Sequence, residues 1–551
     1  MRLRDGSCLP SWASRASVGV FAVLLAAAGC DNNSNPDSGV RIDGDLPWAD
    51  GGGPDSGMPP TDGGGGEIDA GPRPDAGPPP TTGSEPSPPA RVESMGTAGF
   101  LLRGTVLAPT SVLDPGEVLI VGDTIRCVAA DCSGEAGASD ATVIDTQSVI
   151  SPGLIDGHNH LTYDFLPEWV AGITYDNRYT WADEAAYEDH ISPFADGRNQ
   201  NDRICPAVKW GELRSIIHGT TTVMGQSFNR SCIDRLARNA DHFHHIGYDH
   251  MRTSIGSVRD INDETAATIV AGFMEASEPT TRFAVHMQEG IGGGNLLSEF
   301  DSFAGRDTRS NRHMGTSLLS GPGYSGVGML IHSMGLTSAQ LDEAASTGAS
   351  VIWSPSSNLI LYGETAPIAD ILSRDITVGL GPDWTVSGED DMLSEMRVAS
   401  DYARAEGIAA LTTARIWEMA TQGSADAVGL AGALGVLEVG ARADVSVFGR
   451  RSMDPYQAVL DSRAQDVRLV FIDGQAYYGD MALEGAAALN GDCEMLDACG
   501  ALKFLCVANT PGAMNDSARP TETMDDIHSQ LTSILAMYGR ESDLLPLVAC
   551  E

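Results

Sequence analysis

The chain has 551 residues, 42% of them hydrophobic and 20% charged, so most of it can build a buried core. Its length indicates several domains or one large barrel with additions. Asp and Glu number 75 against 34 Lys and Arg, which gives a formal net charge of −41. Because such a charge repels nucleic acid and anionic lipid surfaces, the composition excludes a nucleic-acid-binding protein.

The amino terminus has the features of a bacterial export signal. In residues 1–29, arginines precede an apolar run that is too short to cross a bilayer, which needs about 20 residues. The run ends in Leu-Ala-Ala-Ala-Gly-Cys, which resembles a bacterial lipobox and implies cleavage before Cys30 and lipidation of that cysteine. We therefore expect an exported protein, lipid-anchored in the bacterial cell envelope on its periplasmic or outer side. An ordinary signal peptide with an incidental cysteine is the alternative.

The next segments differ sharply in composition. Residues 30–94 are rich in Gly, Pro and Asp and cannot bury enough apolar surface to fold, so they are predicted to form a disordered tether. In residues 95–150, short apolar runs separated by Gly and Asp predict β-strands, for example at 100–106 and 142–145. A similar strand-rich patch, 436–486, returns near the other end of the chain.

The central segment, 151–435, alternates strand-like apolar runs with helical segments such as 338–347 and 391–406. This alternation predicts an α/β fold with a parallel sheet, and the length of the segment suits a TIM-type (β/α)8 barrel. A doubly wound sheet is less favoured because no Gly-rich dinucleotide loop follows an early strand. The acidic run 387–391 before the second of these helices predicts a helix N-cap.

Residues 487–551 form a cysteine-containing carboxyl-terminal extension. In an exported chain cysteines can form disulfides, and the local pairs we expect are Cys127 with Cys132 and Cys493 with Cys499. The sequence does not determine the connectivity. A zinc knuckle in the extension is the alternative, and the absence of a Cys-x-x-Cys motif disfavours it.

A His-x-His motif follows the first strand of the central segment. The sequence Pro-Gly-Leu-Ile-Asp leads into His158 and His160. Because side chains two residues apart in a strand point to the same side, both imidazoles can meet one metal ion. The motif alone is weak evidence, but the strand that precedes it makes it a strong indication of a metal site.

Three further apolar runs lead to polar residues of the same kind. The first ends in His286, with Glu289 three residues later, the second ends in His332, and the third ends in Asp383. Each of these alone could be a core histidine or a solvated acid. Four strands that each deliver a polar side chain at the carboxyl end are typical of a barrel active site.

In these motifs and their order, residues 95–485 resemble the amidohydrolase superfamily, in the branch that contains the cytosine, guanine and S-adenosylhomocysteine deaminases and the triazine hydrolases. Further matching stretches are 218–223, 354–359 and 435–444. The resemblance implies a barrel accompanied by a small β-sandwich that is built from both flanking segments.

The resemblance also implies a role for each candidate residue. Glu289 matches the acid that shuttles protons, and His332 matches the histidine that polarises the substrate or the bound water. Asp383 would accept a second proton in addition to binding metal. Substrate contacts are expected from Asn358 and from Trp384, which could instead pack the barrel rim. The expected metal ligands are His158, His160, His286 and Asp383.

The sequence favours one divalent metal ion per chain. Many members of the superfamily bridge two metals with a carboxylated lysine on the fourth strand, but the only lysines here are Lys209 and Lys503. A bridging carboxylate such as Glu264 or Glu275 is left open. We expect zinc, with iron as the alternative, because either ion can lower the pKa of a bound water from 15.7 toward about 7.

Together these features predict a metal-dependent hydrolase that acts on carbon–nitrogen bonds other than peptide bonds and deaminates an N-heterocyclic small molecule. One alternative is a cyclic amide or imide hydrolase similar to imidazolonepropionase. Another is a non-catalytic tethered binding protein, which the intact set of expected ligands disfavours. We expect contact with the membrane only through the lipid anchor, and a homo-oligomer is left open.

Overall fold

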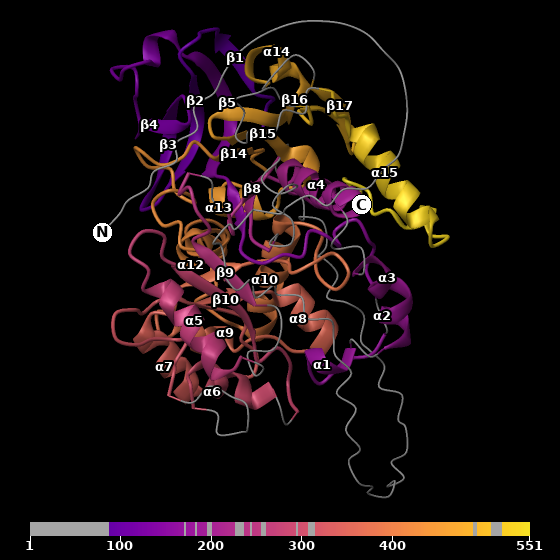
Figure 1. Cartoon of the computed structure of the whole chain (residues 1–551). Coiled ribbons are helices and arrows are strands. Elements are labelled where there is room, and N and C mark those ends of the chain that lie inside the picture. Colours follow the sequence, from indigo (N-terminus) through magenta and orange to yellow (C-terminus); the bar gives the residue numbers. More distant parts are fainter. Residues whose placement is uncertain are drawn as a thin grey trace, which may run out of the picture. The chain divides into compact units, whose positions relative to one another are not determined.

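The computed structural model describes residues 87–550, apart from short internal gaps, and all of the described residues belong to one compact unit, Gly44–Glu551 (Figure 1). The predicted export signal, Cys30 and most of the predicted tether therefore lie outside the described residues. No helix in the described part of the chain is long and apolar enough to cross a bilayer. The internal gaps are 170–171, 182–183, 196–200, 226–235, 243–244, 255–260, 294–295, 307–314, 489–492 and 509–520.

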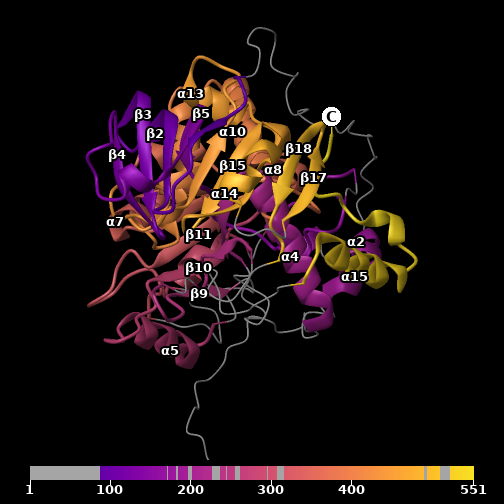
Figure 2. The same cartoon turned by 90° about the horizontal axis from the view of Figure 1, so that it is seen from above.

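Both flanks of the central segment contribute to one ten-stranded sheet, which Figure 2 shows extending from β4 to β17. Its order is β17-β18-β16-β15-β14-β5-β2-β3-β4, with β1 paired to β5. The two flanks meet where β5 and β14 pair in antiparallel register, with Ile150 opposite Val447. The strands are β1 (Arg91–Ser94), β2 (Phe100–Ala108), β3 (Ser111–Val121), β4 (Thr124–Ala129), β5 (Thr142–Pro152), β14 (Val445–Phe448), β15 (Val467–Ile472), β16 (Gln475–Asp480), β17 (Glu494–Ala498) and β18 (Ala501–Leu505).

The central segment supplies two parallel sheets, of three and five strands, in the orders β6-β7-β8 and β13-β12-β11-β10-β9. A parallel bridge between Asn159 and Asp383 links them, and Gly157 N donates to Leu380 O at 2.8 Å. The predicted parallel α/β architecture is confirmed, but no pairing of β8 with β9 is seen among the described residues, so a closed barrel is not shown. The strands are β6 (Leu154–Asp156), β7 (Thr220–Val223), β8 (Arg238–Asn239), β9 (Met251–Ser254), β10 (Arg282–Met287), β11 (Gly328–His332), β12 (Ser350–Trp353) and β13 (Val378–Leu380).

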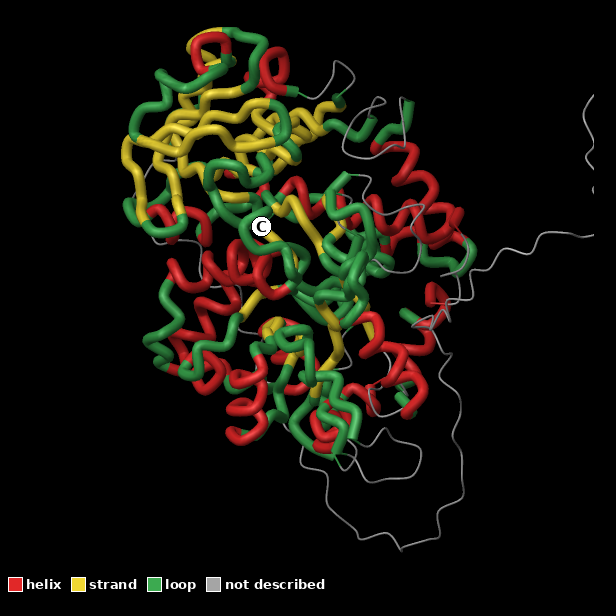
Figure 3. The backbone as a smooth tube through the Cα atoms, turned by 60° about the vertical axis from the view of Figure 1, so that its left-hand side comes forward, coloured by secondary structure: helices red, strands yellow, loops and turns green. Residues whose placement is uncertain are grey.

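Helices connect these strands, and most of the helices lie outside the part of the molecule where the strands gather (Figure 3). The predicted segments 338–347 and 391–406 are helical. The predicted N-cap is confirmed, because the Asp391 side chain accepts a hydrogen bond from Ser394 N. The helices are α1 (Arg178–Trp181), α2 (Ala185–His190), α3 (Ser192–Ala195), α4 (Asn201–Ile217), α5 (Asp263–Phe273), α6 (Glu299–Phe303), α7 (Ser338–Thr347), α8 (Pro355–Tyr362), α9 (Ile368–Leu372), α10 (Met392–Glu406), α11 (Thr413–Glu418), α12 (Ser424–Ala427), α13 (Pro455–Leu460), α14 (Glu484–Ala487) and α15 (Met524–Ala536).

Strands β10, β11 and β12 form the centre of the main hydrophobic core. Their apolar residues, such as Val285, Leu330 and Val351, are buried, and they belong to the same cluster as Ile269 of α5 and Leu341 of α7. Continuous apolar runs of this kind are expected for parallel strands that are covered on both faces. The rigid core therefore fixes the carboxyl ends of these strands, where the candidate site residues lie.

The carboxyl-terminal extension is part of the folded unit. Its strands β17 and β18 extend the ten-stranded sheet, and α15 packs against α4, where Trp210 Nε1 donates to Leu545 O at 2.8 Å. The predicted Cys127–Cys132 disulfide is present. The predicted pairing of Cys493 with Cys499 is wrong, because the β17–β18 hairpin places Cys493 beside Cys506 and leaves Cys499 to bond to Cys550.

Candidate metal and catalytic site

Four buried side chains from four strands of the two parallel sheets converge at one edge of the sheets. His286 and His332 end β10 and β11, His158 follows β6, and Asp383 follows β13. One ligand atom from each residue lies within 4.8 Å of the others. Because the carboxyl ends of parallel strands share an edge, strands far apart in the sequence deliver these groups to one point.

His160 also lies at this point. Its Nε2 is 3.2 Å from Asp383 Oδ1, and Nε2 of His158 is 3.0 Å from the same oxygen. The structure therefore brings together all of the predicted metal ligands and also His332. Which of His160 and His332 binds a metal, and which of them polarises water, stays a prediction.

The chemistry of these groups fits a divalent metal ion. Nδ1 of His158, Nδ1 of His286 and Nε2 of His332 are buried and make no hydrogen bond, and Nε2 of His158 faces only the Asp383 carboxylate, at 3.0 Å. Burial lowers the pKa of His158 and of His332 to about 4, and it lowers the pKa of His286 well below its ordinary value. These imidazoles are thus neutral at neutral pH, and neutral imidazoles beside a carboxylate form a donor set that zinc and iron accept.

Unusual backbone conformations help to position the site. Gln288, His332 and Asp383 have φ angles of 46°, 65° and 76°, in the left-handed region that non-glycine residues rarely adopt. At Gly381 the constraint is steric, because a Cβ at that position would lie 2.5 Å from His158 N. Only glycine lets β13 pass the His-x-His loop so closely, and Asp383 reaches the histidines as a result.

Glu289 lies beside the histidines and is buried. Its Oε2 is 3.6 Å from His332 Nε2, and its Oε1 accepts a hydrogen bond from Tyr362 Oη at 2.6 Å. Burial raises the pKa of Glu289 to about 7, although the nearby Arg178 charge opposes this increase. A carboxyl group with this pKa can both take up and release a proton near neutral pH, as a general acid or base must.

Asn358 lies beside His332 at the start of the segment that follows β12. Its Oδ1 lies 2.9 Å from His332 Nδ1, and its Nδ2 donates to Thr365 Oγ1 at 3.1 Å. The side chain is fully buried, and both ends of its amide are engaged within the protein. Asn358 therefore supports His332, and its contact with substrate stays a prediction.

Trp384 belongs to an aromatic cluster next to His160. Its ring centroid lies 5.4 Å from that of His160, 5.5 Å from that of Tyr163 and 5.8 Å from that of Trp181. Its indole N–H donates to Ser387 Oγ. These contacts match the packing alternative, and stacking on a substrate ring stays a prediction.

Sequence reasoning missed three side chains that support the site. Ser357 Oγ donates to Asp383 Oδ2 at 2.7 Å, Tyr362 donates to Glu289, and Trp181 Nε1 donates to Tyr362 Oη at 3.0 Å. The Ser-Ser-Asn stretch before Leu359 was the only sequence signal near them. Nothing in the local pattern distinguishes Tyr362 from an ordinary core tyrosine.

A second histidine cluster, centred on His242, His245 and His250, is not part of this site. His242 pairs with Asp249 and His245 with Asp473, whereas His250 is fully buried and contacts a backbone carbonyl. His250 therefore does not lie on a solvated face. His244 lies outside the described residues.

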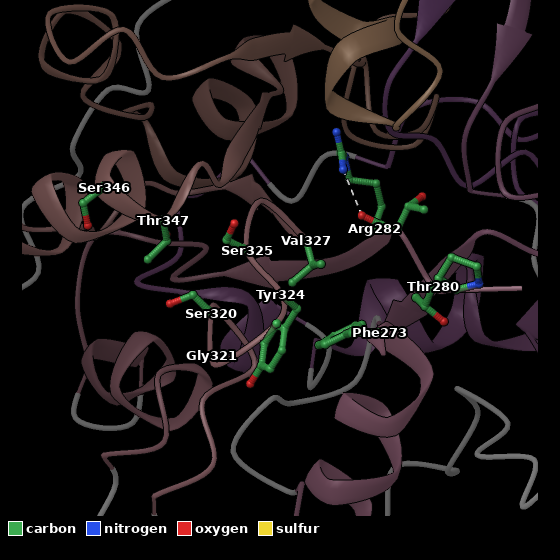
Figure 4. Close-up of a pocket in the computed structure, with 13 residues that line it drawn as sticks. Phe273, Thr280, Arg282, Ser320, Gly321, Tyr324, Ser325, Val327, Ser346 and Thr347 are labelled. Atoms are coloured by element: carbon green, nitrogen blue, oxygen red, sulfur yellow. Dashed lines mark hydrogen bonds between the residues drawn. The ribbon is translucent and has the colours of Figure 1, made fainter. Parts of the chain in front are cut away.

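A cavity of about 810 Å³ opens at the opposite ends of the strands (Figure 4). Arg282 at the start of β10, Val327 just before β11 and Thr347 before β12 line it, and Tyr324 and Phe273 face each other there with ring centroids 5.3 Å apart. The Arg282 guanidinium donates to three backbone carbonyls. None of the candidate site residues lines this cavity, so it has no part in the chemistry of the site.

Comparison with known proteins places these features in a family context. Residues 261–477 match the amidohydrolase family. The chain is 26% identical over 418 residues to a 5-methylthioadenosine/S-adenosylhomocysteine deaminase of Halobacterium salinarum, an alignment that covers 68% of this chain and 91% of the relative. It is 25% identical over 430 residues to a 5'-deoxyadenosine deaminase of Methanothermobacter thermautotrophicus, which covers 71% of this chain and 95% of the relative.

Solved structures share the fold at lower identity. Guanine deaminase of Escherichia coli matches with a TM-score of 0.52 and 17% identity, over 68% of this chain and 99% of that one. Atrazine chlorohydrolase of Arthrobacter aurescens TC1, solved in complex with zinc, matches with a TM-score of 0.51 and 19% identity, over 69% of this chain and 95% of that one. With its buried histidine and carboxylate site, and with the match of residues 261–477 to the amidohydrolase family, the chain is a hydrolytic enzyme.

Proposed function

We propose that this enzyme is a metal-dependent deaminase of an N-heterocyclic small molecule. One observation carries the proposal. Buried, neutral imidazoles, each with at least one ring nitrogen that makes no hydrogen bond, surround Asp383, and Glu289, whose pKa is raised to about 7, lies next to them. A metal-binding donor set beside a carboxyl group that titrates near neutral pH has the two parts that hydrolytic deamination needs.

The donor set suits a single divalent ion, with zinc the first candidate and iron the second. His158, His160, His286 and Asp383 are the proposed ligands, with His332 next to them. When bound, such an ion lowers the pKa of water and makes hydroxide available at neutral pH. The lysine-bridged arrangement of two metals remains excluded because no lysine lies between Lys209 and Lys503.

The protein's own groups would handle the protons. Glu289 takes a proton from the attacking water through its carboxylate and passes it to a ring nitrogen of the substrate, which makes the ring carbon more electrophilic. His332, with Nε2 free of hydrogen bonds, stabilises the charge that develops as the tetrahedral intermediate forms on that carbon. Asp383 would accept the second proton from the hydroxyl group of the intermediate and pass it to the leaving amino group, so that the C–N bond breaks, the C=O bond forms and ammonia is released.

The first substrate class to test is adenine nucleosides. The two relatives with the broad alignments are named as deaminases of 5-methylthioadenosine, S-adenosylhomocysteine and 5'-deoxyadenosine. In adenine the exocyclic amino group is bound to a ring carbon that lies next to a ring nitrogen. Glu289 can donate a proton to that ring nitrogen. Hydrolysis of a cyclic amide or imide is the second candidate, since the same groups can also open a ring.

We also propose that the parallel strands β6 to β13 close into a (β/α)8 barrel and that the enzyme is exported and lipid-anchored through Cys30. The bridge between Asn159 and Asp383 supports the barrel, because it joins the two parallel sheets at one side. The lipobox-like sequence before Cys30 supports the anchor. Globomycin-sensitive processing of the full-length chain, followed by mass spectrometry of the mature amino terminus, tests the anchor directly.

The function is tested by ammonia release from a panel of adenine nucleosides, guanine and cyclic imides. The wild-type enzyme should release ammonia without opening the ring. Glu289→Gln should retain the metal and lower kcat by about 10²–10⁴-fold, because its amide cannot shuttle protons. Glu343→Gln, which removes a carboxylate on the surface, is the matched control and should leave kcat unchanged. Full turnover by Glu289→Gln would refute the assigned role, and ring-opened products would favour the cyclic amide hydrolase.

A further inference from the structure

Helix α8 directly follows β12 and brings three polar side chains to the site. Ser357, Asn358 and Tyr362 are all buried. Asn358 and Tyr362 are four residues apart, so they share one face of the helix, and Ser357 is adjacent to that face. The site groups that they contact come from three other strands, β10, β11 and β13.

The first contact concerns Asp383. Ser357 Oγ donates to Asp383 Oδ2 at 2.7 Å, whereas Asp383 Oδ1 is the oxygen that lies 3.0 Å from His158 and 3.2 Å from His160. The two oxygens of this carboxylate thus have separate partners. One is held by α8, and the other faces the histidines.

The second contact gives the two ring nitrogens of His332 different surroundings. Trp353 Nε1 can only donate, and it donates to Thr365 Oγ1 at 2.8 Å. Asn358 Nδ2 donates to the same oxygen at 3.1 Å, which leaves Asn358 Oδ1 to accept a hydrogen bond from His332 Nδ1 at 2.9 Å. An amide oxygen can only accept, so this contact favours the tautomer of His332 with its proton on Nδ1, which leaves the lone pair on the buried Nε2 that makes no hydrogen bond.

The third contact divides the two oxygens of Glu289. Tyr362 Oη donates to Glu289 Oε1 at 2.6 Å and itself accepts a hydrogen bond from Trp181 Nε1 at 3.0 Å. Glu289 Oε2 is left 3.6 Å from His332 Nε2. Since the indole N–H can only donate, the hydroxyl proton of Tyr362 is directed toward Glu289.

We propose that α8 is the positioning element of this site. Ser357 holds one oxygen of Asp383, Asn358 holds one nitrogen of His332, and Tyr362 holds one oxygen of Glu289. The second oxygen or nitrogen of each of these three groups is left to face the other site groups. This inference rests on the proposed function, because it assigns the three groups that the reaction uses. It adds Tyr362, Ser357 and Trp181 as positioning residues.

The helix is well suited to this task because its own position is fixed. Trp353, which precedes it, is fully buried, and Ser356 N donates to the buried Glu395 Oε1 at 3.2 Å. Ser356 Oγ accepts a hydrogen bond from Glu389 N at 3.1 Å. Contacts that orient metal ligands and catalytic groups typically change metal affinity or activity by about 10–100-fold when they are removed.

Two variants of the full-length enzyme test the proposal by function. Tyr362→Phe keeps the ring but removes the hydroxyl, and it should lower kcat by about 10–100-fold while KM changes by less than about twofold. Ser357→Ala should weaken Zn²⁺ affinity by about 10–100-fold in competition with a chromophoric chelator. The control is Tyr478→Phe, which removes another buried hydroxyl that donates to Ala464 O at 3.2 Å, and it should change neither quantity.

A spectroscopic measurement tests the arrangement without turnover or metal. In metal-free protein with ¹⁵N-labelled histidine, two-bond ¹H–¹⁵N correlations distinguish protonation at Nδ1 from protonation at Nε2. The signal of His332, assigned through its loss in His332→Gln, should show the Nδ1–H form in the wild type. Asn358→Leu should convert it to a mixture of tautomers or to the Nε2–H form.

The outcomes separate this proposal from the proposed function. Wild-type kcat in Tyr362→Phe, wild-type Zn²⁺ affinity in Ser357→Ala, or an Nε2–H form of His332 in the wild type would each overturn the role of α8. If Glu289→Gln is inactive at the same time, the proposed function stands without it. If Glu289→Gln is fully active, the proposed function fails, and the tautomer and Zn²⁺ measurements still decide the role of α8.

Discussion

Arg238 offers a stringent test of how the ten-stranded sheet and the parallel strands are joined. This residue of β8 is fully buried and binds Asp444 with two bonds, Nε to Oδ2 at 2.9 Å and Nη2 to Oδ1 at 2.7 Å. Its Nη2 also lies 2.7 Å from Asp473 Oδ1. Arg238→Met keeps most of the side-chain volume but leaves both carboxylates without this cation.

The magnitude follows from the partners that remain. Asp473 keeps Arg442 at 2.6 Å and His245 at 2.9 Å, so its charge stays compensated. Asp444, which is also buried, keeps the hydrogen bond from Asp473 N at 2.9 Å, and no other cation pairs with it among the described residues. Removing one partner of a buried ion pair costs about 3–5 kcal/mol, so we expect a loss of that size in the free energy of unfolding.

Guanidinium chloride unfolding followed by circular dichroism provides the assay, with the denaturant slope checked for constancy between variants. The double variant Arg238→Met/Asp444→Leu should regain at least half of the loss, because it removes the uncompensated charge. Arg404→Met, at an exposed pair with Asp401 on α10, is the control and should cost at most about 1 kcal/mol. A cost for Arg238→Met no larger than that of the control would refute the reasoning.

The remaining predictions concern acid stability and the carboxyl-terminal extension. Burial tends to raise the pKa of Asp473, but the hydrogen bond from His245 and the charges of Arg238 and Arg442 hold this pKa well below its usual range. The ionised Asp473 therefore stabilises the fold above about pH 4, and this stabilisation is lost as the pH falls through the folded-state pKa. Between pH 5 and pH 3 the wild type should lose about 1 kcal/mol more stability than Asp473→Asn, and parallel losses in chemical denaturation would contradict this assignment. The Cys499–Cys550 disulfide closes a sequence separation of 51, so Cys499→Ser/Cys550→Ser should lower stability by about 4 kcal/mol on the chain-entropy estimate. An unchanged unfolding midpoint, with the wild-type disulfide verified by thiol titration, would show that the extension does not need this cross-link.

The residues at the centre of the site could be predicted because each has a local signal. His286 and His332 end apolar strands, and Asp383 follows one, so strand pattern and residue type together identify them. The parallel βα alternation and the N-cap at Asp391 are local in the same sense. The sequence therefore predicts which strands contribute metal-binding and catalytic side chains, but it does not predict the hydrogen bonds between these side chains.

The supporting contacts could not be predicted, since they depend on tertiary structure. Tyr362 resembles any core tyrosine until the fold brings it to Glu289, and Asn358 lies in a motif that the resemblance assigned to substrate contact. The same limit applies to the disulfides. Cys493 lies closer in sequence to Cys499 than to Cys506, but the register of the β17–β18 hairpin, with Glu494 opposite Leu505, determines the partner.

The central claim is that a buried set of histidines and an aspartate holds one divalent metal ion for hydrolysis. Elemental analysis of the purified full-length chain, before and after dialysis against a chelator, tests this claim most directly. We predict one zinc or iron ion per chain, its loss in His158→Ala/His286→Ala, and parallel loss and recovery of ammonia release on metal removal and return. A wild-type chain that binds no divalent metal even after reconstitution, or that deaminates its substrate equally well without metal, would contradict the account.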